Sequence, residues 1–180
     1  MTAEIAKSRA VFFDKDGTLV NDVPYNVNPD LIVLNEGAAE TVRKLMKAGF
    51  KIFVVSNQSG VARGLFAEKD LMAVWEKLNE LCEIEFDDFY FCPHFPGGKI
   101  PKYSFSCGCR KPEPGMILQA AREHNLDLRN SWIIGDSPND TKAGRLAGCR
   151  TILLRGETNN SDFKAENLKE AAQIILNQAI

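Results

Sequence analysis

Short apolar runs alternate along the chain with longer segments in which apolar residues recur at helical spacing. Five of the short runs are rich in β-branched or aromatic residues and are bounded by polar ones, a pattern typical of buried strands. They lie at residues 10–14 (AVFFD), 50–57 (FKIFVVSN), 86–92 (FDDFYFC), 131–136 (SWIIGD) and 151–156 (TILLRG). The polar stretch that follows the first run, at 21–30, contains Asn and Pro and predicts a loop.

Five helices are predicted between and after these runs, because apolar residues recur there at intervals of three and four. Gly49 and Gly148 stand where a glycine commonly ends a helix, and Pro114 stands near the start of another. The predicted helices cover about 39–46, 71–81, 114–121, 138–147 and 165–180.

Strands that alternate with helices indicate βαβ units and a parallel sheet. Right-handed crossovers place helices on both faces of such a sheet, so we expect an α/β, doubly wound, Rossmann-like fold. The sequence has no internal repeat, low-complexity tract or linker, and we therefore expect one domain over residues 1–180. Folds of this kind bind ligands beyond the carboxyl ends of their strands.

The residues that follow the predicted strands are the chemically capable ones. They are Asp14-Lys15-Asp16-Gly17-Thr18, then Ser56-Asn57-Gln58-Ser59-Gly60, then Arg110-Lys111, and Gly135-Asp136-Ser137-Pro138-Asn139-Asp140. Carboxylates on a partly open site suit Mg²⁺, and a lysine and a hydroxyl suit phosphate oxygens. Each group alone has a plainer interpretation, as a solvated turn, a surface charge or a helix N-terminal charge. Their combination at successive strand ends favours a phosphate site.

Composition and charge exclude several classes of function. Hydrophobic residues make up 44% and charged residues 26% of the chain, which is ordinary for a globular protein. The net charge of −2 argues against a protein that binds nucleic acid by neutralising phosphates. Neither a membrane span nor a signal peptide is recognisable, so we expect a cytoplasmic protein without a membrane partner.

Four residues form the pattern C-x-H-x12-C-x-C: Cys92, His94, Cys107 and Cys109. In a reducing compartment, clustered cysteines are more often metal ligands than disulfides. Four ligands complete a tetrahedral zinc site with no open position, so the predicted role of Zn²⁺ is structural. The alternative is a group of reduced cysteines beside an unrelated histidine. Zinc would fix the loop 92–109 at the point where it enters the predicted site.

The remaining cysteines and histidine have simpler interpretations. Cys82 and Cys149 lie in apolar surroundings and are predicted to be small buried side chains. His124 stands alone on a predicted helix, where we expect a surface or cap residue.

The segments "FFDKDGTL", "VVSNQSG", "RKPEPGM" and "GDSPND" match, in order, the four motifs of the haloacid dehalogenase (HAD) superfamily of aspartate-nucleophile phosphatases. The resemblance runs from about residue 10 to residue 154. It implies that Asp14 is the nucleophile and Asp16 the general acid and base. It also implies that Ser56 and Lys111 stabilise the transferred phosphoryl group.

The resemblance implies a catalytic Mg²⁺ as well. Its ligands would be the carboxylates of Asp14 and Asp136 and the backbone carbonyl of Asp16. Asp140 would lie behind them and orient Lys111 or a metal-bound water.

Within the superfamily the chain resembles the bacterial heptose bisphosphate phosphatases, which act in the synthesis of nucleotide-activated heptose for surface glycans. The twelve residues between His94 and Cys107 match the longer zinc loop of that group. No insertion is large enough for a separate cap domain, so specificity would come from two short loops, residues 21–26 (NDVPYN) and the zinc loop. We expect a monomer, which is common among similar uncapped enzymes. The implied substrate-binding residues are Asp22, Val23, Pro24, Tyr25, Asn57, Gln58, Ser59 and Arg110.

Two alternatives remain open at this point. The related histidinol-phosphate phosphatases resemble the chain in the same C-x-H…C-x-C-R-K-P pattern, usually with a shorter loop. A receiver-like phospho-switch also phosphorylates an Asp on a doubly wound sheet and uses a nearby Lys. Asp16 argues against that switch because a carboxylate at this position makes the phosphoaspartate short-lived, and a receiver needs no zinc loop.

Overall fold

A computed structural model describes residues 6–157 and 160–178 of the protein. Within these residues, six strands form one sheet in the order β3-β2-β1-β4-β5-β6, and each neighbouring pair is parallel. The strands are β1 (Ala10–Phe13), β2 (Lys51–Asn57), β3 (Asp88–Cys92), β4 (Trp132–Gly135), β5 (Arg150–Leu154) and β6 (Phe163–Ala165). The predicted doubly wound parallel sheet is confirmed.

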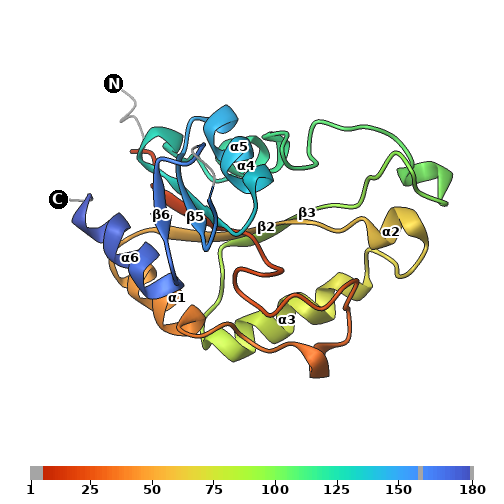
Figure 1. The fold of residues 1–180 in the computed structure, drawn as a ribbon, viewed down its shortest axis with the longest axis horizontal. Coiled ribbons are helices and arrows are strands. Elements are labelled where there is room, and N and C mark those ends of the chain that lie inside the picture. Colours follow the sequence, from red (N-terminus) through yellow and green to blue (C-terminus); the bar gives the residue numbers. More distant parts are fainter. Residues whose placement is uncertain (1–5, 158–159, 179–180) are drawn as a thin grey trace.

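Helices cover both faces of the sheet (Figure 1). α1, α3 and α6 lie on one face and α4 and α5 on the other, while the short α2 lies beyond the carboxyl end of β2. The helices are α1 (Ala38–Lys47), α2 (Gly60–Arg63), α3 (Asp70–Cys82), α4 (Gly115–Glu123), α5 (Pro138–Ala147) and α6 (Leu168–Asn177). Single 3₁₀ turns occur at Pro29–Leu31, Pro101–Tyr103 and Leu128–Asn130.

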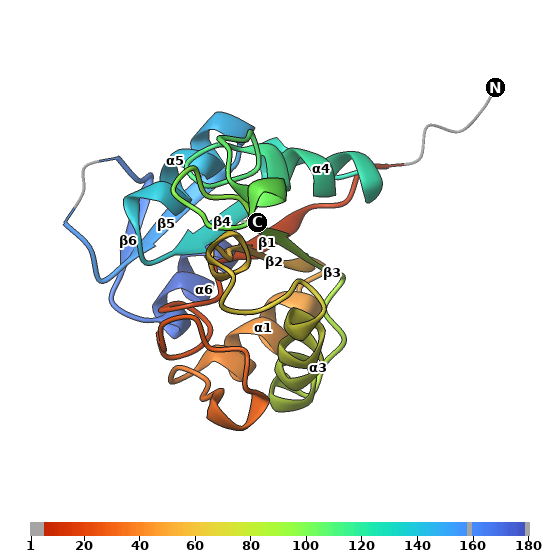
Figure 2. The same ribbon diagram turned by 90° about the vertical axis from the view of Figure 1, so that its right-hand side faces the viewer.

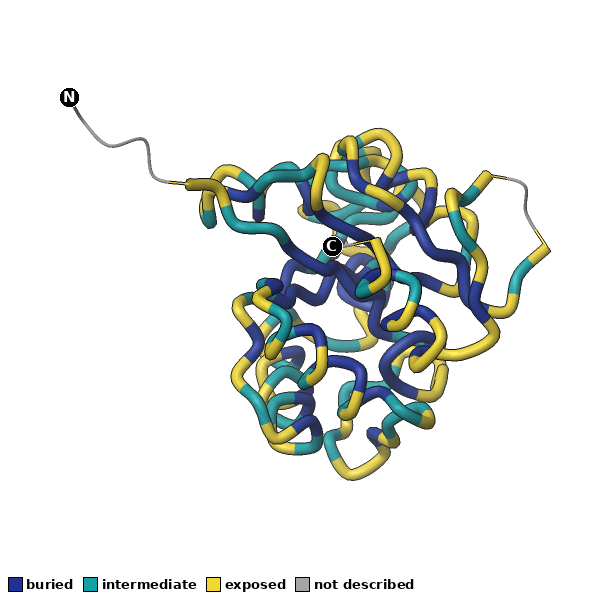
Figure 3. Tube along the Cα trace, turned by 90° about the vertical axis from the view of Figure 1, so that its left-hand side faces the viewer, coloured by how far each residue is buried: buried dark blue, intermediate teal, exposed yellow. Residues whose placement is uncertain are grey.

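Alternation of side chains along the strands divides the core between the two faces. Val11 and Phe13 of β1 pack into the cluster under α1, α3 and α6. Phe12 packs with Phe53 against α4, with ring centroids 5.3 Å apart. β1, β2 and β4 are buried on both sides, and buried segments of the chain run through the middle of the molecule in Figure 3. This double burial explains why they read as continuous apolar runs.

The predicted ends of two helices follow from their caps. α5 covers the predicted residues and begins with a capping box, in which the Ser137 and Asp140 side chains each accept a bond from the other's backbone N–H. It ends at Gly148, whose φ of 88° is in the left-handed region that glycine adopts freely. α1 likewise ends just before Gly49, with a φ of 85°.

The start predicted for the closing helix, residue 165, was wrong. Residues Phe163–Ala165 instead form β6, which pairs with β5. The helix begins at Leu168 because the Asn167 side chain accepts a bond from the Glu170 N–H and caps it. Residues 179–180 of the predicted helix lie outside the described residues.

The isolated cysteines are buried, as predicted: Cys82 is 0% and Cys149 6% exposed. Burial raises the pKa of the Cys82 thiol to about 11 and that of Cys149 to about 12, so both are unreactive thiols. His124 is the C-cap residue of α4, and its Nε2 lies 3.3 Å from Asp88 Oδ2. None of the described helices has the length and apolarity needed to cross a membrane.

Candidate active site

The predicted chemical residues meet at the carboxyl ends of the strands, which face the viewer in Figure 2. Asp14 follows β1 and Asp136 follows β4. These adjacent strands flank the point where the strand order reverses direction, which is where doubly wound sheets bind ligands. The Asp14 N–H donates to the Ile134 carbonyl at 3.0 Å, so the two strand ends are fixed to each other.

Lys111 joins the two buried carboxylates of the site. Its Nζ lies 2.6 Å from Asp14 Oδ1 and 2.6 Å from Asp140 Oδ1, and it donates to the Val55 carbonyl at 2.7 Å. The Lys111 side chain is only 4% exposed. Three acceptors at these distances hold the ammonium group in one position beside the carboxylate of Asp14.

Burial and charge together set the protonation of these groups. Burial raises the pKa of Asp14 to about 7, against the opposing effect of Lys111. Burial also raises the pKa of Asp136. For Lys111, burial favours the neutral amine, but the carboxylates of Asp14 and Asp140 outweigh it and raise its pKa. One ammonium group thus faces three carboxylates, and a divalent cation would relieve their repulsion.

The donor set fits a hard cation. Asp14, Asp136 and Asp140 each offer a carboxylate oxygen, and these oxygens lie within 4.8 Å of one another. Asp140 is already engaged, since its Oδ2 accepts from the Ser137 N–H and hydroxyl at 3.1 and 2.7 Å and its Oδ1 contacts Lys111. Asp136 lies against Gly17, where an added Cβ would be 2.0 Å from its Oδ2. Any other residue would be strained at the φ of 80° that Gly17 adopts and would have to displace the Asp136 carboxylate.

Asp16 is held by two neighbours. The Lys15 ammonium contacts its Oδ1, and Gln58 Nε2 donates to its Oδ2 at 3.0 Å. Gln58 Nε2 also donates to the Ser56 hydroxyl at 2.8 Å. The structure thus brings together the predicted acid–base residue and the predicted phosphoryl-binding hydroxyl.

Asn35 and Arg155, neither of which was predicted as a site residue, support the site together with Lys15, which follows the first strand between Asp14 and Asp16. Asn35 Nδ2 donates to the carbonyls of the turn after β1, at Gly17, Thr18 and Val20. Arg155 donates to the Gly17 carbonyl, and Lys15 is buried beside Asp16. The position of Arg155 directly after β5 was a usable signal, because the same strand-end rule applies to it. Asn35 could not be identified from the sequence, because the carbonyls that it binds lie 15 to 18 residues away along the chain.

Asn57 links two strand ends. Its Nδ2 donates to the Lys111 carbonyl at 2.9 Å, and its Oδ1 accepts from the Lys111 N–H at 3.0 Å. The residue predicted to contact substrate therefore uses its amide to hold the backbone of Lys111.

A cavity of about 260 Å³ opens beside Asp16. Its lining contains seven of the eight predicted substrate-binding residues, together with Asn26 and Gly60: Asp22, Val23, Pro24, Tyr25, Asn57, Gln58 and Ser59. Arg110 is the exception, because it borders a separate hollow of about 510 Å³ next to Lys111 and the zinc loop. Its Nη1 lies 3.4 Å from the His94 carbonyl oxygen.

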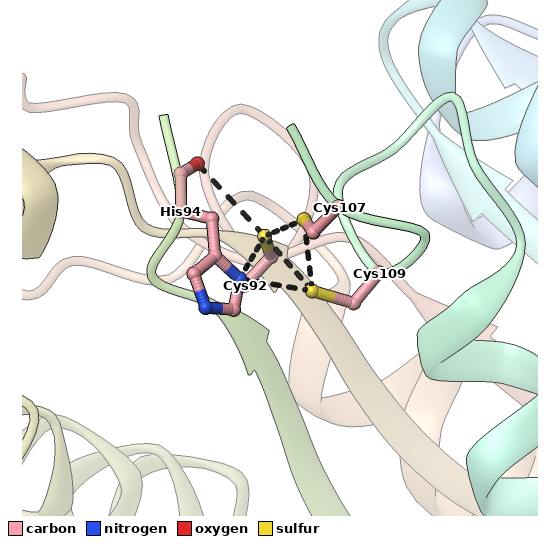
Figure 4. Close-up of side chains that lie close together, drawn as sticks. All are labelled: Cys92, His94, Cys107 and Cys109. Atoms are coloured by element: carbon pink, nitrogen blue, oxygen red, sulfur yellow. Dashed lines mark hydrogen bonds between the residues drawn. The ribbon is translucent and has the colours of Figure 1, made fainter. Parts of the chain in front are cut away.

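The four predicted zinc ligands converge at the end of β3 (Figure 4). The Sγ atoms of the three cysteines lie 3.1 to 3.4 Å apart, and His94 Nδ1 is 3.3 Å from Cys109 Sγ. Contact with Cys92 lowers the pKa of the Cys109 thiol to about 5, and a thiolate is the form that binds metal. Cys92 is the last residue of β3, so the cluster is anchored to the sheet.

Comparison with known proteins identifies the class. The HAD-hydrolase-like family model matches residues 108–178. The chain is 38% identical to a D-glycero-beta-D-manno-heptose-1,7-bisphosphate 7-phosphatase from Yersinia pestis, covering 81% of this chain and 79% of that one. It is 35% identical to the corresponding alpha enzyme from Photorhabdus laumondii, covering 82% of each chain.

A solved structure agrees with this class. The D,D-heptose 1,7-bisphosphate phosphatase from B. bronchiseptica, complexed with magnesium and phosphate, aligns with a TM-score of 0.81 and 29% identity, covering 94% of this chain and 99% of that one. The doubly wound sheet and the carboxylates at its switch point define a HAD-like hydrolase. The chain belongs to the D-glycero-D-manno-heptose-1,7-bisphosphate 7-phosphatase family.

Proposed function

We propose that this protein is a Mg²⁺-dependent phosphatase that removes the 7-phosphate of D-glycero-D-manno-heptose 1,7-bisphosphate through an aspartyl-phosphate intermediate. The observation that carries the proposal is Asp14 at the carboxyl end of β1, paired with Lys111 and adjacent to the cavity that Asp16 lines. The names of relatives that cover most of the chain support the substrate.

The reaction proceeds in two displacements. A carboxylate oxygen of Asp14 attacks phosphorus, and the bond from phosphorus to the sugar oxygen breaks while Asp16 gives that oxygen a proton. Asp16 then takes a proton from water, which attacks phosphorus and releases inorganic phosphate and the Asp14 carboxylate. Ser56 and Lys111 hold the phosphoryl oxygens as their charge changes.

Asp14, Asp136 and the Asp16 carbonyl would hold the Mg²⁺, and Asp140 would keep Lys111 in place. The ion supplies positive charge that offsets the repulsion between the anionic nucleophile and the anionic phosphate. The 4.8 Å grouping of oxygen donors and the magnesium in the B. bronchiseptica enzyme support this assignment.

We infer that Cys92, His94, Cys107 and Cys109 bind a structural Zn²⁺. Three sulfurs and one ring nitrogen at mutual contact distances fit a closed tetrahedral site. Within the described residues, none of the five cysteines forms a disulfide. This supports the cytoplasmic location predicted from the sequence. A monomeric state remains a prediction.

The alternative substrate is histidinol phosphate. The relatives named for heptose bisphosphate and the long zinc loop favour the sugar bisphosphate. The experiment is steady-state phosphate release with Mg²⁺ on both heptose bisphosphate anomers and on histidinol phosphate. We expect kcat/KM for one heptose bisphosphate anomer to be at least about tenfold higher than for histidinol phosphate, the effect of one charged contact. Equal or higher values for histidinol phosphate would reverse the assignment.

Activity should fall at low pH, because protons and Mg²⁺ compete for the carboxylate of Asp14. Asp14 must be ionised to attack, yet burial raises its pKa to about 7 in the metal-free site. A nearby cation favours the carboxylate. Lowering the Mg²⁺ concentration should therefore move the acid half-point of kcat/KM to higher pH. Profiles at several Mg²⁺ concentrations test this, and an acid limb that does not move with Mg²⁺ argues against Asp14 as a ligand.

A further inference from the structure

We propose that Arg63 binds the second phosphate of the substrate and so determines the preference for a sugar bisphosphate over a sugar monophosphate. This inference rests on the proposed function, because the 1-phosphate stays on the sugar while the 7-phosphate reacts. Arg63 is the last residue of α2, the helix that begins at Gly60 on the wall of the 260 Å³ cavity. It belongs to none of the predicted sets of site residues.

Arg63 lies between the loop after β1 and the proposed zinc loop. Its guanidinium carbon is 4.1 Å from the centroid of the Phe95 ring and 5.8 Å from that of Tyr25. Tyr25 lines the cavity, and Phe95 directly follows the proposed zinc ligand His94. The aromatic faces hold the cation in place through the ring quadrupole without using its N–H donors.

The donors of Arg63 are left for a ligand. Its Nε is buried without a hydrogen-bond partner, and within residues 6–157 and 160–178 Arg63 forms no ion pair. By contrast, Arg43 pairs with Glu83 and with the Cys82 carbonyl. A buried donor without a partner costs free energy that an anionic ligand would recover. The guanidinium fork matches the oxygens of a phosphate group.

A second cation lies beside the same ring. The guanidinium carbon of Arg110 is 5.3 Å from the Phe95 centroid, so Arg63 and Arg110 both border this aromatic side chain. Lys111, in contrast, forms ion pairs with Asp14 and Asp140. Positive charge beside Phe95, in addition to that of Lys111 beside Asp14, fits a substrate that carries two phosphates.

The proposed zinc loop fixes the backbone next to Arg63. The Ala62 carbonyl accepts from the N–H groups of Lys99 and Ile100 at 2.7 and 2.9 Å. Gly98 permits this contact, since a Cβ there would lie 2.6 Å from the Ala62 oxygen. α2 and the loop lie side by side at the right of Figure 1. Arg63 therefore stands on a rigid support.

The test compares kcat/KM for heptose 1,7-bisphosphate with kcat/KM for heptose 7-phosphate, which lacks the 1-phosphate. We expect Arg63→Met to lower the ratio of these values by about tenfold or more, the effect of losing one charged hydrogen bond, mainly through a higher KM for the bisphosphate. Arg63→Lys keeps the charge, so its ratio should lie between those of the wild type and Arg63→Met. The matched control is Arg122→Met, an exposed arginine of α4, for which the ratio should equal that of the wild type.

Two results would overturn the proposal: an unchanged ratio in Arg63→Met, or equal losses on both substrates, which indicate a structural role. If Arg63→Met does not fold, Arg63→Lys decides alone, because its ratio must still fall below that of the wild type. Failure of the proposed function is recognised separately, as a wild-type enzyme that releases no phosphate from either heptose bisphosphate anomer.

Discussion

Asp14→Asn is expected to lower phosphate release by at least about 10³-fold, because the amide is a poor nucleophile of nearly the same shape. Its position at the end of β1 and its contact with Lys111 make it the group best placed to attack a bound phosphate. Steady-state assays with contaminating phosphatase excluded measure the loss. Asp30→Asn, which changes an exposed aspartate of the 3₁₀ turn Pro29–Leu31, should retain full activity. More than about a tenth of wild-type activity in Asp14→Asn would remove Asp14 from this role.

The same variant should remain folded. The folded-state pKa of Asp14, about 7, lies above its ordinary value of 3.8, so the folded protein holds this proton more tightly than the unfolded chain does. Stability from this group is present below pH 3.8 and is lost as pH rises through about 7. Removing the charge should therefore not lower the melting temperature of the Mg²⁺-free protein at pH 8. A large decrease would indicate that the carboxylate holds the fold together.

Zinc removal should have the second largest effect. Purified protein is expected to contain about one zinc per chain, and Cys107→Ser should lower that content. Activity should fall by about 10²-fold, because the end of the loop carries Lys111 and a displacement of about 1 Å there is costly. Lys111→Ala should lose activity while it keeps its zinc.

Metal analysis beside kinetics distinguishes the two variants. Ser106→Ala, a change at an exposed neighbour of Cys107, should retain both zinc and activity. A zinc-free Cys107→Ser protein with an unchanged fold and full activity would contradict the structural role proposed for the metal.

Much of the fold and the site could be predicted from local signals. Asp14 and Asp136 each follow a doubly buried strand, and parallel strands bring their carboxyl ends to one edge. The four zinc ligands are visible as a spaced pattern. The helix over Pro138–Ala147 was predicted correctly because Pro138 stands at its first position and Gly148 ends it.

What could not be predicted depends on tertiary contacts or on very short elements. β6 has three residues and α2 has four. These lengths are too short to show the alternation of a strand or the three-to-four spacing of a helix. Asn35 donates a hydrogen bond to the turn after β1, and Asn57 donates one to the Lys111 carbonyl, 54 residues further along the chain. The proposed role of Arg63 could not be predicted, because it depends on the rings of Tyr25 and Phe95, which only the fold brings beside it.

The central claim is that this chain removes one particular phosphate from heptose 1,7-bisphosphate. Phosphorus NMR of a single reaction, with Mg²⁺ and the preferred anomer, tests it most directly because each phosphate of the substrate has its own signal. The account predicts that the 7-phosphate signal disappears as inorganic phosphate grows, while the 1-phosphate signal persists on the sugar. Loss of the 1-phosphate first, or persistence of both signals with active-site integrity verified, would contradict it.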